Sequence, residues 1–449
     1  MADISDIFKS YDIRGKVGTE LTAAVAEAVG RAFADWLPSA GAVAVGRDMR
    51  PDSGELADAL IKGLREQGRD VIDIGEVTSD MIYFAVGHLK LAGGAMVTAS
   101  HNPGVYNGIK LCREEARPVG LESGLAEVRD TALGNNFKSR DAQGDVSSQD
   151  ITEDWVQHVL SFIDDSKLKP IKIAVDAGNG MAGKIFPELE PYVPWEVHEM
   201  YFELDGTFPN HEANPLKFET LADLMKVIKD EGLYGGVAFD GDGDRAFLVD
   251  ETGAVLTGGV MSAMMADYFL DLEPGASIIY DARNSRSVPK VVTDKGGKPV
   301  ITKVGHANIK QVMRDTNAPF GGEASGHFYF RDNWFADSGL IGAVIGLYVA
   351  TLSGKKLSEL RQQYTLYEAI PETNFEVADK DAALRRVTEA FKDDQQDSLD
   401  GLTVIIDTST WFNIRASNTE PVMRLNAESD SRQRLDELVA KVTKLITQG

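Results

Sequence analysis

Three segments of the chain repeat one pattern: a strand-like apolar run, a polar loop that opens with Asp or Gly-Arg-Asp, and an amphipathic stretch. They read AVAVGRDMRPDS at 42–53, IKIAVDAGNGMAG at 171–183 and ASIIYDARNSRSV at 276–288. Strands that alternate with helical periods form βαβ units and mostly parallel sheets. The repeat therefore predicts three α/β domains of similar build.

The last part of the chain has a different pattern. EAIPETNFEVAD and LDGLTVIIDTSTWFNI alternate like strands, and RQRLDELVAKVTKLI is an amphipathic helix. A chain of 449 residues is too long for a single core. We therefore predict an α/β chain of four domains: α/β domains with mixed or parallel sheets at 1–145, 146–252 and 253–364, and an α+β domain at 365–449.

The charge and cysteine content restrict the partners and the compartment. The net charge of -24 argues against nucleic acid or an anionic membrane as a partner. The one cysteine, Cys112, excludes an intramolecular disulfide and fits a reducing cytoplasm. No signal peptide pattern is present at the N-terminus, and no run reaches the roughly 18 apolar residues of a membrane span. We expect a cytoplasmic protein that acts on small molecules.

The stretch TASHNP at 98–103 follows LAGGAMV, which is typical of a buried strand. Ser100 and His101 would stand at the end of that strand, next to a loop made by Pro-Gly. A hydroxyl beside an imidazole at a strand end suggests catalysis. The alternative is an ordinary turn rich in Ser and Asn.

The stretch GGVAFDGDGDRAFLVDETG at 235–253 alternates three carboxylates with glycines. Asp240, Asp242 and Asp244 would repel one another unless a cation neutralised them, and oxygen ligands favour Mg²⁺. An EF-hand is disfavoured because Arg245 occupies the position that needs glycine and strand-like runs flank the loop. An acidic surface turn is the remaining alternative.

Two glycine-rich stretches carry histidines. KVGHANIK contains His306, and GGEASGHFYF contains Glu323, Ser325 and His327. Glu and Ser on an exposed loop can bind sugar hydroxyls. An isolated His in such a loop would more often be structural.

Further polar residues stand in loops suited to anions. Bidentate guanidinium and short hydroxyl donors are what a phosphate site requires. One such set occurs in WFNIRASNTEPVMRL: Arg415, Ser417, Asn418 and Thr419. SYDIRG and NGIK each hold one cation, Arg14 and Lys110, in a loop bounded by glycine. A surface turn is the alternative for each of these loops.

Taken together, these stretches resemble the α-D-phosphohexomutase family, and no Walker loop, HExxH or GxSxG competes. YDIRG, TASHNP, NGIK, DGDGDR, GHANIK, GEASGH and RASNTEP follow that family's order from residue 11 to residue 421. The resemblance implies three α/β domains and one α+β domain around a central cleft.

The resemblance also implies roles for individual residues. Ser100 would be the phosphorylated serine, which together with Asp240, Asp242 and Asp244 would ligate one Mg²⁺. The residues implied near the transferring phosphoryl group are Arg14, Lys110, Arg245 and His327. The residues implied to bind the phosphosugar are Tyr11, His101, His306, Glu323, Ser325, Arg415, Ser417, Asn418 and Thr419.

The implied reaction has two phosphoryl transfers. Phosphoserine donates to a hexose phosphate, the resulting hexose 1,6-bisphosphate turns around, and its other phosphate returns to Ser100. Within the family, Asn418 and the FYFRD continuation favour interconversion of mannose 6-phosphate and mannose 1-phosphate. Ala324 departs from the common form, so glucose phosphates are an alternative and glucosamine phosphates a weaker one.

Other classes of function remain as hypotheses. A non-catalytic phosphosugar-binding protein would need no phosphate on Ser100, and a Mg²⁺ phosphatase would pass the phosphoryl group to water. The expected partners are phosphosugars, and the expected assembly is a monomer or a weak homo-oligomer.

Overall fold

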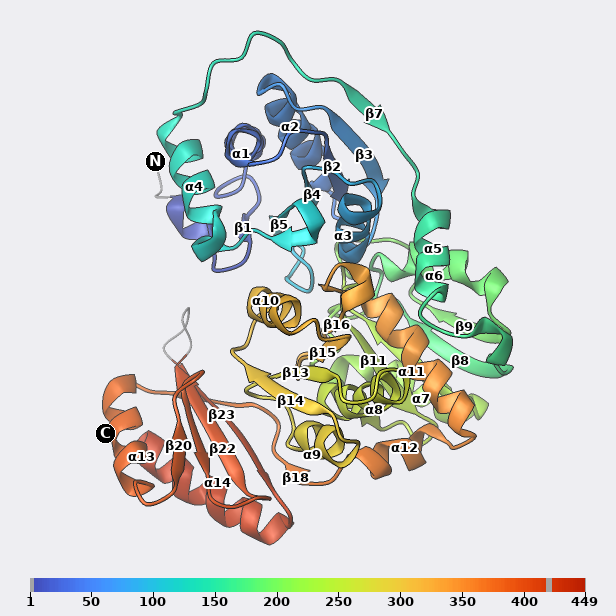
Figure 1. Ribbon diagram of the computed structural model, residues 1–449, viewed down its shortest axis with the longest axis vertical. Coiled ribbons are helices and arrows are strands. Elements are labelled where there is room, and N and C mark those ends of the chain that lie inside the picture. Colours follow the sequence, from blue (N-terminus) through green and yellow to red (C-terminus); the bar gives the residue numbers. More distant parts are fainter. Residues whose placement is uncertain (1–3, 417–421, 449) are drawn as a thin grey trace. The chain divides into compact units, whose positions relative to one another are not determined.

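The computed structural model describes residues 4–416 and 422–448 and contains two compact units. The first unit is Met1–Leu256 with Ser325–Ser358, and the second is Thr257–Ala324 with Glu359–Gly449 (Figure 1). The chain therefore leaves the first unit, returns to it for a short segment and leaves it again.

The first unit begins with a mixed sheet of order β1-β5-β4-β2-β3-β7, with β6 paired to β5. Strands β4, β2, β3 and β7 run parallel, whereas β1, β5 and β6 are antiparallel to their neighbours. The strands are β1 (Ile13–Lys16), β2 (Val43–Arg47), β3 (Val71–Glu76), β4 (Gly93–Val97), β5 (Tyr106–Arg113), β6 (Arg117–Pro118) and β7 (Val146–Ser148). The helices of this region are α1 (Ala23–Trp36), α2 (Ser53–Glu66), α3 (Ser79–His88) and α4 (Leu125–Gly134).

Helix α1 illustrates how the local sequence builds this layer. The Thr22 hydroxyl accepts a hydrogen bond from the Val25 N–H and caps the first turn. Ala26, Val29 and Phe33 then recur at helical spacing and are buried in the core of the sheet. Because β2 and β4 are parallel, the loops that follow them emerge at the same edge of the sheet.

The rest of the first unit is built on a second sheet of order β12-β11-β10-β8-β9. Its strands are β8 (Ile171–Asp176), β9 (Trp195–Met200), β10 (Gly235–Phe239), β11 (Ala246–Asp250) and β12 (Val255–Leu256). Its helices are α5 (Thr152–Leu160), α6 (Ala182–Leu189) and α7 (Ala222–Glu231). The returning segment adds an antiparallel pair, β16 (Phe328–Phe330) and β17 (Ala336–Asp337), and the buried helix α11 (Gly339–Ser353).

The second unit holds parallel strands β14-β13-β15 and a separate antiparallel sheet of order β18-β23-β22-β21-β20, with β19 paired to β23. The strands are β13 (Ser277–Asp281), β14 (Lys298–Thr302), β15 (Phe320–Gly322), β18 (Glu368–Ala369), β19 (Thr373–Glu376), β20 (Gln395–Asp397), β21 (Leu402–Ile405), β22 (Trp411–Ala416) and β23 (Val422–Ser429). The helices are α8 (Gly258–Leu272), α9 (Ser287–Asp294), α10 (His306–Thr316), α13 (Lys380–Ala390) and α14 (Arg432–Thr447). Helix α12 (Leu357–Tyr364) carries the chain from the first unit into the second.

The predicted fold class is confirmed. The three repeats of the sequence form β2, β8 and β13, each within parallel strands, and the C-terminal segment forms an antiparallel sheet with helices α13 and α14. Among the described residues, no single helix is long and apolar enough to cross a membrane, and only the bent pair of α11 and α12 passes that test together.

Candidate active site

Ser100 lies three residues beyond the end of β4, in the first unit. Its backbone has a φ of 51°, which is uncommon for a residue with a side chain, and the residue is only 5% exposed. The Ser100 hydroxyl donates to Asp240 Oδ2 at 2.9 Å. The serine oxygen and the aspartate loop, which stand 140 positions apart in the chain, are therefore in direct contact.

The aspartate loop joins β10 to β11, which are antiparallel neighbours. Strands rather than helices flank the loop, so the structure does not have the EF-hand arrangement. Glycine is required at position 241, because a Cβ there would stand 2.6 Å from the Ser100 carbonyl oxygen. Asp240 and Asp242 are fully buried, and Asp244 is nearly so.

Two cations contact the three carboxylates. Lys110, on β5, donates to Asp242 Oδ2 at 2.7 Å and to Asp244 Oδ2 at 2.6 Å. Arg245 Nε donates to Asp240 Oδ2 at 2.9 Å, and its backbone N–H donates to Asp240 Oδ1 at 3.1 Å. The set therefore has three acidic groups and two fixed positive charges.

Burial and these charges move the pKa values in opposite directions. Burial, with the neighbouring Asp244 and Asp242, raises the pKa of Asp240 to about 7, although Arg245 opposes the shift. Burial acts in the same direction on Asp242, but the charge and hydrogen bond of Lys110 outweigh it and hold the pKa of Asp242 well below its usual range. The carboxylates in turn hold the pKa of Lys110 well above its usual range, against the effect of its burial.

The donor set fits a hard cation. One oxygen from each of Asp240, Asp242 and Asp244 lies within 4.8 Å of the others. Asp242 Oδ1 and Asp244 Oδ1 are buried and accept no hydrogen bond from any residue in the described ranges. A buried carboxylate oxygen without a donor is costly, and a divalent ion bound by oxygen would remove that cost.

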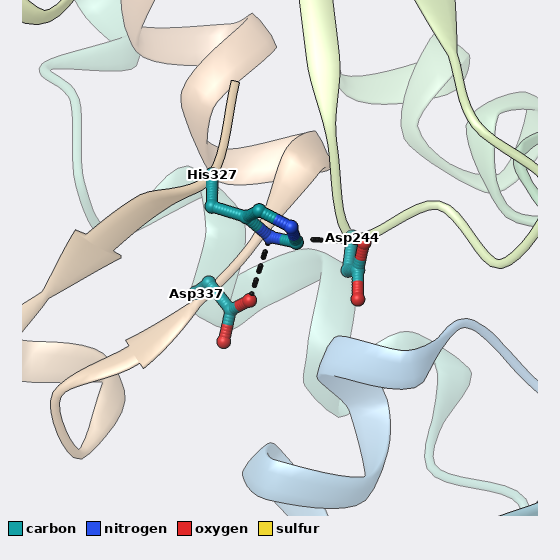
Figure 2. A group of neighbouring side chains, drawn as sticks. All are labelled: Asp244, His327 and Asp337. Carbon is teal, nitrogen blue, oxygen red and sulfur yellow. Dashed lines mark hydrogen bonds and ion pairs between the residues drawn. The ribbon is translucent and has the colours of Figure 1, made fainter. Parts of the chain in front are cut away.

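His327 lies beside Asp244, as Figure 2 shows. Its Nδ1 stands 2.9 Å from Asp337 Oδ2 and 3.8 Å from Asp244 Oδ1. Burial lowers the pKa of His327, but the charge of Asp244 and the hydrogen bond to Asp337 outweigh it and raise the pKa. Because Nδ1 faces a carboxylate, Nε2 is the nitrogen that can exchange a proton.

His101 and Arg14 border the serine loop. His101 Nδ1 stands 3.1 Å from the Ser100 hydroxyl and accepts a hydrogen bond from Arg245. Burial and the charge of Arg245 lower the pKa of His101 well below its usual value, so its imidazole is neutral. Arg14, on β1, donates to Asn102 Oδ1 at 2.7 Å.

The second unit brings together another part of the predicted set. Glu323 is buried, and its carboxylate lies 3.5 Å from Arg283. Glu372 pairs with Arg283 at 3.9 Å and with Arg415, on β22, at 3.3 Å. Glu323 and Arg415 are thus linked through Arg283 and Glu372.

The remaining predicted residues are placed as follows. Tyr11 is partly buried just before β1, and His306 is the first residue of α10. Ser325, although adjacent to the segment that holds Glu323, belongs to the first unit. Three residues lie outside the described part of the chain: Ser417, Asn418 and Thr419.

Several residues with close contacts to this set were not singled out from the sequence. Arg283 and Arg50 each follow a strand of the threefold repeat by two or three positions, so the repeat itself was an available signal. Asp337 stands ten positions beyond His327, on the antiparallel neighbour of β16. Glu372 stands 43 positions from Arg415, and none of the motifs singled out above for their chemistry contains Asp337 or Glu372.

Comparisons with known proteins assign the chain to a family. Four models of the phosphoglucomutase/phosphomannomutase family match it: alpha/beta/alpha domain I at 5–133, alpha/beta/alpha domain II at 153–253, alpha/beta/alpha domain III at 257–367 and the C-terminal domain at 372–445. The chain belongs to the phosphoglucomutase/phosphomannomutase family. It is an enzyme of the isomerase class, an α-D-phosphohexomutase.

Relatives cover nearly the whole length. A protein of Xanthomonas campestris pv. campestris (strain B100) named phosphohexose mutases is 42% identical, and the phosphomannomutase of Escherichia coli (strain K12) is 41% identical; each match covers 94% of both chains. A crystal structure of a phosphoglucomutase/phosphomannomutase family protein from Burkholderia thailandensis superposes with a TM-score of 0.91. That protein is 32% identical, and the match covers 100% of this chain and 99% of the other.

Proposed function

We propose that this phosphohexomutase interconverts mannose 6-phosphate and mannose 1-phosphate through a phosphoserine at Ser100 and a hexose 1,6-bisphosphate intermediate. One observation carries the proposal: the Ser100 hydroxyl contacts Asp240 within a buried carboxylate triplet, beside Lys110 and Arg245. A serine held only for packing would not need two cations and a metal-suited acidic loop around its oxygen.

Asp240, Asp242 and Asp244 would hold Mg²⁺ together with an oxygen of the phosphorylated serine. The ion would supply positive charge to the oxygens of the transferring group. This proposal rests on the donor set, because the buried oxygens of Asp242 and Asp244 lack hydrogen-bond donors in the described ranges.

In the first transfer, the bond between phosphorus and Ser100 Oγ breaks as a bond forms from phosphorus to the free hydroxyl oxygen of the sugar. Arg245 and Lys110 balance charge on the phosphoryl oxygens, because both side chains are fixed by carboxylates of the same loop. His327 Nε2 accepts the proton of the sugar hydroxyl, while Asp337 holds the opposite ring nitrogen.

The second transfer is the reverse reaction with the other phosphate of the bisphosphate. His327 returns the proton to the sugar oxygen, and Ser100 is phosphorylated again. A site that binds the non-reacting phosphate must accept either end of the intermediate. We assign that site to Arg415 with Ser417, Asn418 and Thr419, and sugar recognition to Glu323 and Ser325 with His306.

The sugar preference is the finer part of the proposal. The family description covers both glucose and mannose phosphates, and the curated relatives quoted above include a phosphomannomutase. Glucose phosphates are therefore the alternative substrates. Contacts in the GEASGH stretch, where Ala324 stands between Glu323 and Ser325, would determine the preference.

The test combines mass spectrometry with turnover. The purified protein should carry one phosphate on Ser100, and it should isomerise mannose 1-phosphate faster than glucose or glucosamine 1-phosphate when primed with a hexose 1,6-bisphosphate. Ser100→Ala should abolish most isomerisation and retain phosphosugar binding, whereas Ser161→Ala, at an exposed helix end, should match the unmodified enzyme.

Three results would contradict the proposal. Full activity of Ser100→Ala would show that the reaction does not pass through a phosphoserine at Ser100. Release of free phosphate faster than isomerisation would indicate a phosphatase. Binding without turnover, with no phosphate on Ser100, would indicate a non-catalytic phosphosugar-binding protein.

A further inference from the structure

Arg50 is a buried arginine whose hydrogen bonds converge on the loop that carries Ser100. It follows β2 by three positions and is only 3% exposed. Its Nε donates to Asp48 Oδ2 at 3.2 Å, and its backbone N–H donates to Asp48 Oδ1 at 3.0 Å. Asp48 therefore orients the guanidinium through its Nε and leaves the other two nitrogens to bind elsewhere.

The other two nitrogens of the Arg50 guanidinium bind four backbone carbonyls, three in the Ser100 loop and one at the start of β5. One nitrogen donates to the carbonyl oxygens of Ser100 at 2.7 Å and Asn102 at 2.6 Å. The other donates to the carbonyl oxygens of Pro103 at 3.1 Å and Tyr106 at 2.9 Å. One rigid cation thus holds three carbonyls of the turn and the carbonyl of Tyr106, the first residue of β5.

These contacts bear on the unusual backbone of Ser100. A residue with a side chain gains nothing from positive φ by itself, and such conformations persist only where surrounding contacts hold them. The Ser100 carbonyl is held by Arg50, and the Ser100 N–H donates to the Thr98 hydroxyl at 2.9 Å. Because the peptide groups before and after Ser100 are both held, the Ser100 hydroxyl is directed at Asp240.

The surroundings of Arg50 leave it little freedom to move. The Asp48 carboxylate also accepts from the Ser53 hydroxyl, which in turn accepts from Asn107 Nδ2 at 2.9 Å. The guanidinium carbon of Arg50 stands 5.2 Å from the centre of the Phe208 ring, within cation–π range. Arg50 and these neighbours, here called the clamp, come from the segment after β2, from the start of α2, from β5 and from the loop that contains Phe208.

We propose that Arg50 is a positioning residue for the phosphoryl transfer: by binding the carbonyls of Ser100, Asn102, Pro103 and Tyr106, it holds the serine oxygen in line with the aspartate triplet. This inference rests on the proposed function of Ser100. Arg50 does not touch the reacting atoms, so it acts on the geometry of the transfer and leaves phosphosugar binding intact.

Arg50→Lys tests the proposal. Lysine keeps the charge, but its single ammonium has three donors and no planar fork, so it cannot hold all four carbonyls. A displacement of the serine oxygen by about 1 Å can cost on the order of 10²-fold in rate. We expect kcat to fall by about that factor, while KM and the calorimetric affinity for mannose 1-phosphate stay unchanged.

Arg69→Lys is the matched control. Arg69 also donates to several backbone carbonyls, those of Ala34, Leu37 and Ser39, at the end of α1. Its replacement removes the same kind of clamp away from the Ser100 loop. We expect Arg69→Lys to lower the melting temperature and to leave kcat unchanged.

A milder second variant keeps the test valid if Arg50→Lys does not fold. Ser53→Ala removes one donor from Asp48 and one acceptor from Asn107, and it leaves Arg50 in place. We expect a smaller fall in kcat, again with KM unchanged.

The outcomes separate this inference from the proposed function. Suppose that the unmodified enzyme isomerises and carries phosphate on Ser100. If Arg50→Lys and Ser53→Ala then have the same kcat as the control Arg69→Lys, the positioning role of Arg50 is wrong and the phosphoserine mechanism stands. A rise in KM with unchanged kcat would also overturn it. If the unmodified enzyme neither isomerises nor carries phosphate on Ser100, the proposed function itself fails.

Discussion

Lys110→Met tests whether the aspartate triplet is a charge-balanced site for a cation. Lys110 contacts Asp242 and Asp244 at 2.7 and 2.6 Å, and both carboxylates are buried. The variant leaves three carboxylates against Arg245, with no other Lys or Arg pairing with them among the described residues. Methionine is the side chain closest in shape to lysine, so the substitution removes the charge of Lys110 and largely keeps its packing.

The size of the effect follows from burial. Removing one partner of a buried ion pair costs about 3–5 kcal/mol, and because the Lys110 side chain is 19% exposed we expect the lower end, about 3 kcal/mol. Lys62→Met is the matched control. Lys62 pairs with Glu27 at 2.8 Å, but its side chain is 59% exposed, so its loss should lower the unfolding free energy far less than the loss of Lys110.

The assay is denaturant unfolding of both variants and the unmodified protein, first with a chelator and then with saturating Mg²⁺. In chelator, the unfolding free energy of Lys110→Met should fall below that of the unmodified protein by the full amount, about 3 kcal/mol. Mg²⁺ should narrow that deficit, because the ion binds most tightly where the carboxylates are least neutralised, and a ligand at 100 times its Kd adds about 2.7 kcal/mol. Lys62→Met should respond to Mg²⁺ as the unmodified protein does.

Two results would refute this reasoning. If Lys110→Met is no less stable than Lys62→Met in chelator, the carboxylates do not depend on Lys110 for neutralisation. If Mg²⁺ leaves the deficit of Lys110→Met unchanged, the ion does not bind among these carboxylates.

Three further predictions concern other parts of the molecule. Gly241→Ala should place a Cβ 2.6 Å from the Ser100 carbonyl, costing about 1–3 kcal/mol in thermal unfolding and lowering kcat; unchanged kcat would contradict the close packing. Burial lowers the pKa of His211, but its hydrogen bond to Asp176 outweighs burial and raises the pKa, so its stabilising effect is complete below the unfolded value of about 6.5 and is lost as pH rises through the higher folded value. The unfolding free energy of His211→Gln should therefore fall short of the unmodified protein more at about pH 6 than at about pH 8.5, and an equal deficit at both would be contrary to this sign. Arg415→Ala should weaken phosphosugar affinity by about 10- to 100-fold in calorimetry, as expected for a lost charge-assisted hydrogen bond of about 1.5–3 kcal/mol, and undiminished affinity would exclude it from the phosphate site.

The order of strands and loops was predictable because its causes are local. The apolar runs that became β2, β8 and β13 are each followed by a polar loop, and hydrophobic period and turn residues act over a few positions. The rejection of an EF-hand at Asp240 was predictable for the same reason, since the runs on both sides have strand character.

The chemical character of the site could also be predicted from short motifs. Three carboxylates that alternate with glycine around Asp242 repel one another and require neutralisation in any fold. The apolar run before Ser100 places that serine at the end of a strand. Their mutual contact was predicted only through the resemblance, because nothing within either stretch specifies a partner 140 positions away.

Long-range packing decided the rest. Arg50 binds the Ser100 loop only because parallel strands bring their carboxyl ends to one edge, and His327 lies beside Asp244 only because the chain returns to the first unit after residue 324. The sequence alone determined which side chains could carry phosphate chemistry, since that depends on residue type and local turns. The tertiary structure decided which of them are buried, paired and charged, because desolvation and Coulomb energies depend on distances between segments that no local pattern encodes.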